Sequence, residues 1–226
     1  MIDPWKEIRK GCFGNVEPSV ELIAKTEPLG DFDIEELPAL SASISYGSEV
    51  KGIWGAKKLN QQLIQKLHLT PLESVSFNFL VSGISKACGA QLSRHRIGQG
   101  HVSLSRRYTK QKSSFIYPLF DYLEDEATVR HLYQVISDTN RSALSSYKNL
   151  LDNDAKKGDA RLVMPVSVST ERQWWINARA LRDFFRLRLD LAAEWEIRRL
   201  AYMLLDLVYM LTPSLFEDIY EKFNNC

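Results

Sequence analysis

Cysteine is scarce in this sequence: the 226 residues contain only Cys12, Cys88 and Cys226, and no CxxC pair. This scarcity argues against a disulfide framework and a cysteine-based zinc site, and it is typical of proteins in a reducing cytosol. Histidine is nearly as rare, with four residues and no HxxxH or HExxH spacing. We therefore expect no bound metal ion and a cytoplasmic location.

The sequence also lacks an excess of charge of either sign. Lysine and arginine total 29 against 28 aspartates and glutamates, which gives a formal charge of +1. A chain without a global positive field does not bind polyanions indiscriminately, so any anion must be bound by a local cluster of cations.

Long apolar runs are missing as well. The start, MIDPWKEIRK, is charged where a signal peptide requires an apolar core. The most apolar stretch, residues 191–211, is interrupted by glutamate, arginine and aspartate, which favours a buried helix over a membrane span. Neither a secretion signal nor a membrane association is therefore predicted.

The glycine-rich motifs that bind nucleotides are absent. The sequence contains no GxGxxG and no GxxxxGK[ST], and GCFG at residues 11–14 lacks the context of a strand and a helix. A nucleotide, if one binds, must be held by other groups.

Apolar periodicity predicts most of the elements. Helical spacing indicates helices at 57–67, 84–92, 176–189 and 190–211, one or two amphipathic helices within 120–152, and a short helix after Pro213. Alternation predicts strands at 74–83, ended by Gly83, and within 160–175, and the run VELIA favours a short strand. Because no repeat, linker or low-complexity tract occurs, we expect a single domain over residues 1–226, of the α/β (α+β) class, with a mixed sheet core wrapped by long helices.

Positive charge is concentrated in RHRIGQGHVSLSRRYTK, residues 94–110. The pattern predicts that this stretch starts at the end of a helix and continues as a loop broken by Gly98 and Gly100. Further along, Arg179, Arg182 and Arg186 share one helical face. Taken alone, helix arginines are usually solvated or paired with acidic neighbours, so their spacing does not establish a binding site.

Several ordered segments carry more information than these charges. Arg94-His95-Arg96, followed after eight residues by Ser105-Arg106-Arg107, resembles the signature of flavin-dependent thymidylate synthases. Other blocks are similar to that family in the same order: SASISYGSE, HLTPLES, the glutamine of QLSRHR, ARLVMP, and NARALRDFFRLRLDLAAEWEI. The blocks run from about Ser41 to Ile197, and such an ordered series is far less accidental than one short motif.

The resemblance implies a set of binding residues. It implies that FAD is contacted by Thr70, Arg94, His95, Arg96, Asn177, Arg179 and Asp183, with guanidinium groups replacing a glycine-rich loop at the pyrophosphate. It assigns the nucleotide substrate to Gln91, Ser103, Ser105, Arg107, Arg161 and Arg188. Arg107 or Arg161 would hold the phosphate. The catalytic residues would be Arg188, against the uracil edge, together with His68 and Ser105.

The resemblance also implies the reaction and the assembly. Members of the family methylate C5 of dUMP to give dTMP; 5,10-methylenetetrahydrofolate donates the carbon, FAD carries the hydride and NADPH is the reductant. No cysteine attacks the pyrimidine in that chemistry. The family further implies a homotetramer whose sites are shared between subunits.

Three features depart from the family pattern, one of which is the glycine-rich segment IGQGHVSL, which lacks the commoner Ser-x-Asn-Glu pattern. Ser103 stands where relatives often have glutamate, and Asp183 stands where an asparagine of the flavin-binding helix is usual. These departures leave open a related flavin-dependent enzyme that acts on UMP, or that transfers a hydroxymethyl group. A nucleic-acid-binding module using the basic stretch with Tyr108 and Phe115 is an alternative of another class, which the near-neutral charge disfavours. We interpret Arg106 and Lys110 as surface charge.

Overall fold

The computed structural model describes residues 3–224, so Cys226 lies outside the described part of the chain. The chain forms two compact units, each built from separated segments. Unit 1 contains residues up to 19, 81–92 and 102–172, and unit 2 contains residues 20–80, 93–101 and the chain from 173 onward. Because each of the four strands of the sheet contributes residues to both units, the expected single domain stays a prediction.

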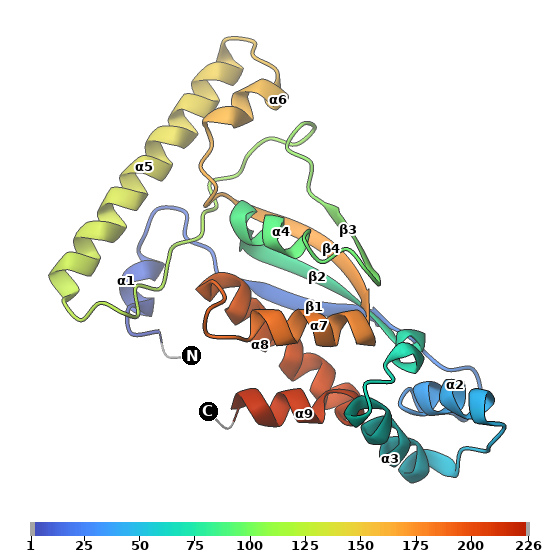
Figure 1. Ribbon diagram of the computed structural model, residues 1–226. Helices are drawn as coiled ribbons and strands as arrows, with labels where there is room; N and C mark the ends of the chain where they lie inside the picture. Colours follow the sequence, from blue (N-terminus) through green and yellow to red (C-terminus); the bar gives the residue numbers. More distant parts are fainter. Residues whose placement is uncertain (1–2, 225–226) are drawn as a thin grey trace. The chain divides into compact units, whose positions relative to one another are not determined.

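Four strands form one sheet: β1 (Ser19–Lys25), β2 (Ser76–Ser85), β3 (Gln99–Ser103) and β4 (Ser169–Asn177). Their order is β1-β2-β4-β3, with β2 and β4 at the centre (Figure 1). Backbone bonds join the end of one strand to the start of its neighbour, as in Thr26 N to Ser76 O and Ala178 N to Val75 O. Neighbouring strands are therefore antiparallel, and the expected mixed sheet is wrong, because alternation marks a strand without giving its neighbour's direction.

Strand β2 follows the predicted alternation but continues beyond its predicted end. Phe77, Phe79 and Val81 are buried, with more exposed residues between them. Gly83 lies inside the strand with φ of +64°, and a Cβ there would come within 2.0 Å of the Glu17 carbonyl oxygen. This glycine thus permits a close approach of two backbones and does not end the strand.

Strand β3 occupies residues that were expected to form a loop. Its glycine, Gly100, faces the indole of Trp175, where an added Cβ would come within 2.5 Å of the ring. A short, glycine-containing segment has little β-propensity of its own. Backbone pairing, including Asn177 N to Gly98 O at 2.9 Å and Leu104 N to Glu171 O at 3.0 Å, makes it a strand.

Unit 1 contains α1 (Lys6–Lys10), α4 (Lys86–Leu92), α5 (Glu126–Asp152), α6 (Lys157–Ala160) and the 3₁₀ turn η2 (Arg161–Val163). The amphipathic pattern within 120–152 forms the single long helix α5 (Figure 1). Asp125 caps it by accepting a hydrogen bond from Thr128 N at 2.8 Å. The core packs Phe115, Tyr117 and Val168 against buried residues of α5.

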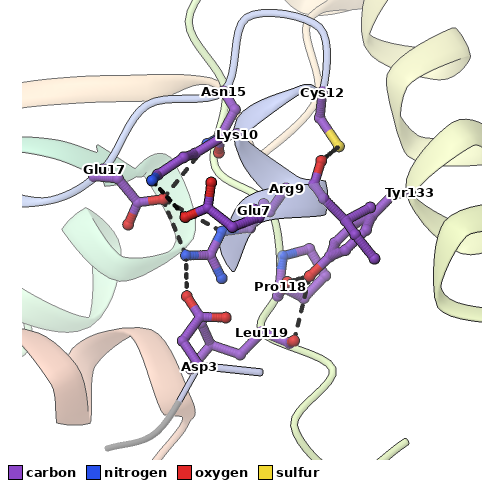
Figure 2. A network of polar contacts seen from close by, with 11 residues as sticks. Asp3, Glu7, Arg9, Lys10, Cys12, Asn15, Glu17, Pro118, Leu119 and Tyr133 are labelled. Atoms are coloured by element: carbon purple, nitrogen blue, oxygen red, sulfur yellow. Dashed lines mark hydrogen bonds and ion pairs between the residues drawn. The ribbon is translucent and has the colours of Figure 1, made fainter. Parts of the chain in front are cut away.

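An ion-pair network centred on Arg9 lies within residues 3–17 of unit 1 (Figure 2). Arg9 is buried and donates to carboxylates of Asp3 and Glu17, the latter at 3.0 Å. Nearby, the Tyr133 hydroxyl donates to the Pro118 carbonyl at 2.9 Å, and burial raises the pKa of Tyr133 to about 12. Residues 3–17 are therefore linked to one another by ion pairs between their own side chains.

Unit 2 contains α2 (Glu36–Tyr46), α3 (Gly52–Gln65), the 3₁₀ turn η1 (Thr70–Ser74), α7 (Ala178–Arg188), α8 (Trp195–Leu211) and α9 (Pro213–Asn224). Aromatic rings form its core, with Trp174 and Phe184 at 5.2 Å and Phe77 and Phe216 at 6.1 Å between centroids. The predicted helices before Pro71 and after β4 are confirmed. Helix α2 was not predicted, because its proline and serines have weak helix propensity.

Candidate active site

A cavity of about 320 Å³ lies in unit 2, between the segment that follows α4 and the first turns of α7. Residues assigned to the flavin line it: His95, Arg96, Asn177, Arg179 and Asp183. Four further lining residues were not in the predicted set: Glu73, Ile97, Gly98 and Ala180. Glu73 belongs to HLTPLES, so the resemblance already contained a signal for it. The others are apolar or small, and no motif marked them.

Asn177 caps helix α7 at the wall of the cavity. Its Oδ1 accepts a hydrogen bond from Ala180 N at 2.9 Å. Gly98, with φ of +66°, lies so close that a Cβ would come within 2.6 Å of Asn177 Nδ2. A glycine is therefore required where the RHR segment meets the start of α7. The first N–H groups of an eleven-residue helix give this end of the cavity a partial positive charge.

Two arginines of α7 have acidic neighbours. Arg179 Nη1 lies 2.6 Å from Glu73 Oε1, and both side chains are nearly half exposed. Arg186 lies 3.8 Å from Asp183. Exposed pairs of this kind contribute little stability, so an anion that enters the cavity can compete for Arg179 at small cost.

Arg182, on the same helix, has a different environment. It is fully buried, and its two Nη atoms donate to the two carboxylate oxygens of Asp218 at 2.8 and 2.6 Å. The expectation that these helix arginines are solvated or paired with acidic residues on neighbouring turns is thus wrong for Arg182, whose acidic partner lies on α9 and compensates its burial.

His95 and Arg188 are joined by a hydrogen bond. Arg188 Nε donates to His95 Nε2 at 3.0 Å, and the imidazole packs edge-on against Phe184 with centroids 5.0 Å apart. Burial, reinforced by the Arg188 charge, lowers the pKa of His95 to about 4. His95 is therefore neutral at pH 7, with its proton on Nδ1, since arginine can only donate.

Two residues assigned to the flavin do not line this cavity. One of them, Thr70, begins η1 and is exposed. Arg94 is exposed and does not line the described cavity. His68 is also exposed, at the end of the α3 segment. The structure thus brings five of the assigned flavin residues to one cavity, whereas these three side chains are exposed and do not line it.

Most of the residues assigned to the nucleotide belong to unit 1. Arg107 and Arg161 line a second cavity, of about 760 Å³, together with Tyr108, Lys110 and Lys156. Lys157 Nζ donates to the Tyr108 carbonyl at 2.7 Å, and this hydrogen bond links α6 to residues 105–108. Aspartates 152, 154 and 159 also line this cavity.

The other nucleotide residues of unit 1 lie outside these lining sets. Ser105 begins a turn in which its carbonyl accepts from Thr109 Oγ1 at 2.9 Å. The Ser103 hydroxyl is buried and has no hydrogen-bond partner within residues 3–224. Gln91 is half-buried on α4. Arg188, the last assigned residue, belongs to unit 2.

Arg106 was interpreted as surface charge, and this interpretation is wrong. Its side chain is buried in unit 1, and Nη2 donates to the carbonyl oxygen of Ser169 on β4. Arginine is usually exposed, so composition alone predicts the wrong environment here. Lys110, in contrast, is exposed.

The described residues lack the features of two other classes of site. Residues 3–224 contain no cluster of three or more histidine, cysteine, aspartate or glutamate side chains suited to a metal ion. None of their helices combines the length and apolar character needed to cross a membrane. Cys12 and Cys88 form no disulfide within these residues.

Comparison with known families identifies the chain's relatives. A family model described as thymidylate synthase complementing protein matches residues 22–214. The chain belongs to this family. The match contains all the residues assigned to flavin and nucleotide, whereas most of the segment held by the Arg9 network precedes it.

Individual members of the thymidylate synthase complementing family agree with this assignment. The flavin-dependent thymidylate synthase of Nitratidesulfovibrio vulgaris strain Hildenborough is 32% identical over 217 residues, covering 88% of this chain and 86% of the relative. The enzyme of the same name from Geobacter sulfurreducens is 33% identical, with 82% of each chain covered. That from Thermosipho africanus is 31% identical and covers 78% of this chain and 82% of its own.

Proposed function

We propose that this chain is a flavin-dependent thymidylate synthase that methylates C5 of dUMP to give dTMP. The carbon donor would be 5,10-methylenetetrahydrofolate, FAD the hydride carrier and NADPH the reductant. The observation that carries the proposal is the unit 2 cavity, where five residues assigned from separated motifs line one space. The proposal is supported because residues 95–98 and 177–183, about 80 positions apart in the sequence, line the same cavity.

The donors of this cavity fit a flavin nucleotide. Arg96 and Arg179 provide guanidinium groups, and the start of α7 provides backbone N–H groups and a positive dipole end. Gly98 packs closely on Asn177, and a larger residue at position 98 would collide with the asparagine side chain. These groups suit an anionic, planar and polar ligand, and the flavin, when bound, would supply the capacity to transfer the carbon unit and hydride.

Arg188 would act at the pyrimidine. A guanidinium beside N3 and O4 stabilises the negative charge that develops as C5 becomes nucleophilic. Its Nε is already used by His95, so the remaining Nη groups would face the nucleotide. Because His95 is neutral, it holds the arginine without adding a competing positive charge.

Arg107 and Arg161 would bind the nucleotide phosphate. They line the same cavity in unit 1 and neither has an ion-pair partner within residues 3–224. Guanidinium groups that form no ion pair are suited to phosphate oxygens, although aspartates 152, 154 and 159 also line this cavity. We further propose, on the resemblance alone, a homotetramer with sites shared between subunits and a cytoplasmic location.

A visible spectrum of the purified protein, followed by activity assays, tests this function. We expect a bound flavin spectrum, and release of C5 hydrogen from dUMP in the presence of NADPH and methylenetetrahydrofolate. Arg96→Gln should weaken flavin binding by roughly tenfold, because a charge-assisted hydrogen bond is lost, whereas Arg94→Gln at the surface should weaken it less. A colourless protein that binds no added FAD and releases no hydrogen would refute the proposal.

Ser103 motivates one alternative outcome within the same chemistry. Its buried hydroxyl replaces a frequent family carboxylate and has no partner in residues 3–224, so it can accept or donate a bond to a nucleotide sugar. Paired reactions with dUMP and UMP, analysed by product mass, decide between the two substrates and between methyl and hydroxymethyl transfer. The nucleic-acid module is less well supported, because the buried Arg106 cannot contribute to a basic surface.

A further inference from the structure

Arg106 is a buried cation that has no counter-ion among residues 3–224. Its side chain is 6% exposed, and of its donors only Nη2 forms a hydrogen bond, to the neutral carbonyl of Ser169. Nε is buried and has no partner within residues 3–224. A buried guanidinium ordinarily pairs with a carboxylate, because an uncompensated charge costs several kcal/mol of desolvation. Donor capacity and positive charge therefore remain unused at this position.

The side chain lines a cavity of about 270 Å³ that lies within unit 1. Lys112, Ser114, Ser169 and Thr170 line the same space. The hydroxyls of Ser169 and Ser114 are hydrogen-bonded to each other at 2.8 Å, and each retains further capacity toward a ligand. A guanidinium, an ammonium and hydroxyl groups around one cavity are the donors that an oxyanion requires. We call this space the Arg106 cavity.

Two carboxylates also line the Arg106 cavity. The charge of Glu17 is compensated by Arg9, whose Nη2 lies 3.0 Å from it (Figure 2). Glu171 is exposed and has no ion pair within the described residues, so its charge opposes an anion. Lys86 is a further cation that interacts electrostatically with Arg106. Burial and the charges of Arg106 and Arg161 lower the pKa of its ammonium group.

We propose that the Arg106 cavity binds the oxyanion group of a small molecule, a carboxylate or a phosphate, with Arg106 as the main donor. Arg106 does not belong to the lining of the Arg107 and Arg161 cavity, nor to that of the flavin cavity. The proposal therefore does not depend on the proposed function, and an inactive protein would still bind the anion here.

The experiment is an NMR titration of the full chain labelled with ¹⁵N-arginine, in which the Nε–Hε signal of Arg106 reports directly on the site. Inorganic phosphate and glutarate are added separately, at constant ionic strength maintained with chloride. We expect a saturable shift of the Arg106 signal with at least one of them. The more effective anion then distinguishes a phosphate ligand from a carboxylate ligand. A signal that neither anion shifts to saturation would overturn the proposal.

Three variants separate binding from a structural role. Arg106→Gln should weaken the effective anion by roughly tenfold or more, measured by calorimetry, since a charged hydrogen-bond donor is removed. Lys112→Gln should weaken it by a smaller factor, and Glu171→Gln should strengthen it, because a repulsive charge is lost. Arg130→Gln, at an exposed arginine of α5, is the matched control and should change nothing.

The two exposed positions keep the test decisive even if Arg106→Gln does not fold. Lys112 and Glu171 lie at the surface of the cavity, so their replacement perturbs the core little. Opposite effects on the Arg106 signal titration support the proposal. Identical anion affinities in wild type, Lys112→Gln and Glu171→Gln would contradict it and would leave Arg106 a purely structural residue.

Discussion

Arg188 Nε donates a hydrogen bond to His95 Nε2 at 3.0 Å, which joins the end of helix α7 to the central residue of the RHR segment. The histidine had been assigned to the flavin and the arginine to the pyrimidine. Through this contact, the histidine assigned to the flavin would orient the arginine assigned to the pyrimidine. Phe184, 5.0 Å from the imidazole, restricts the ring from another side.

The low pKa of His95 makes the free energy of unfolding depend on pH. Its folded-state pKa of about 4 lies below the ordinary value of 6.5, so the unfolded chain binds more protons between these two values. Stability should therefore be constant with respect to His95 above pH 6.5 and fall as the pH decreases toward 4. Because the side chain is partly exposed, we expect a loss of about 2 kcal/mol from this group.

Urea denaturation at pH 4.5 and pH 7.5 measures this loss. In His95→Gln the difference in unfolding free energy between the two pH values should be smaller than in wild type. His131→Gln, at an exposed histidine of α5, is the control and should retain the wild-type difference. An unchanged pH difference in His95→Gln would contradict the assigned neutral state.

Removal of Arg188 should raise the pKa of His95. The arginine charge is the second cause of the lowered value, after burial, so Arg188→Gln should move the pKa up from about 4 while burial keeps it below 6.5. Titration of the His95 ring signal by NMR measures the change. Asp183→Asn provides a control of opposite sign, because the Asp183 carboxylate favours the protonated imidazole. Equal shifts in both variants would rule out the electrostatic explanation.

Gly98→Ala should disturb the flavin cavity as well as stability. The new Cβ would lie 2.6 Å from Asn177 Nδ2 and 2.9 Å from Ala180 Cβ, at a backbone φ of +66°. Gly47→Ala is the matched control, because Gly47 also has a positive φ, of +58°, but open space around it. We expect a loss of about 1 kcal/mol for Gly47→Ala and about 2–4 kcal/mol for Gly98→Ala.

Denaturation curves and flavin affinity together test the role of Gly98. The displaced Asn177 and α7 should reduce flavin binding in Gly98→Ala, whereas Gly47→Ala should bind the flavin as wild type does. Equal unfolding free energies for the two variants would show that the contact with Asn177 is not tight.

The elements that the sequence predicted best have strong periodic patterns. Alternation in β2, and helical spacing in α3, α5 and α7, determine which residues are buried, so local pattern and tertiary structure agree. Strand β3 and helix α2 depend on their surroundings instead. Strand β3, with its single glycine Gly100, is formed by backbone pairing and by the close approach to Trp175, neither of which is visible in a local window.

The candidate site could be predicted only in part for a similar reason. Motif resemblance selected residues that line the cavity, but it contained no distances. The contact between His95 and Arg188 joins residues 93 positions apart, and the burial of Arg106 depends on a β4 carbonyl 63 positions away. Such relationships arise from strand pairing and helix packing, which single-residue preferences do not encode.

The ion pair between Arg182 and Asp218 offers a test of what holds α7 to α9. Arg182 is fully buried, whereas Asp218 is nearly half exposed. Asp218→Ala should destabilise the protein by roughly 2–3 kcal/mol, because it leaves a buried guanidinium whose only remaining described partner is the Leu215 carbonyl. Arg182→Met should cost less, since it removes the charge and keeps much of the apolar volume.

Asp138→Ala, which breaks an exposed pair with Arg141, is the control and should cost under about 1 kcal/mol. The measurement is urea denaturation at pH 7.5, and a larger loss for Arg182→Met than for Asp218→Ala would show that arginine packing, and not charge compensation, dominates at this interface.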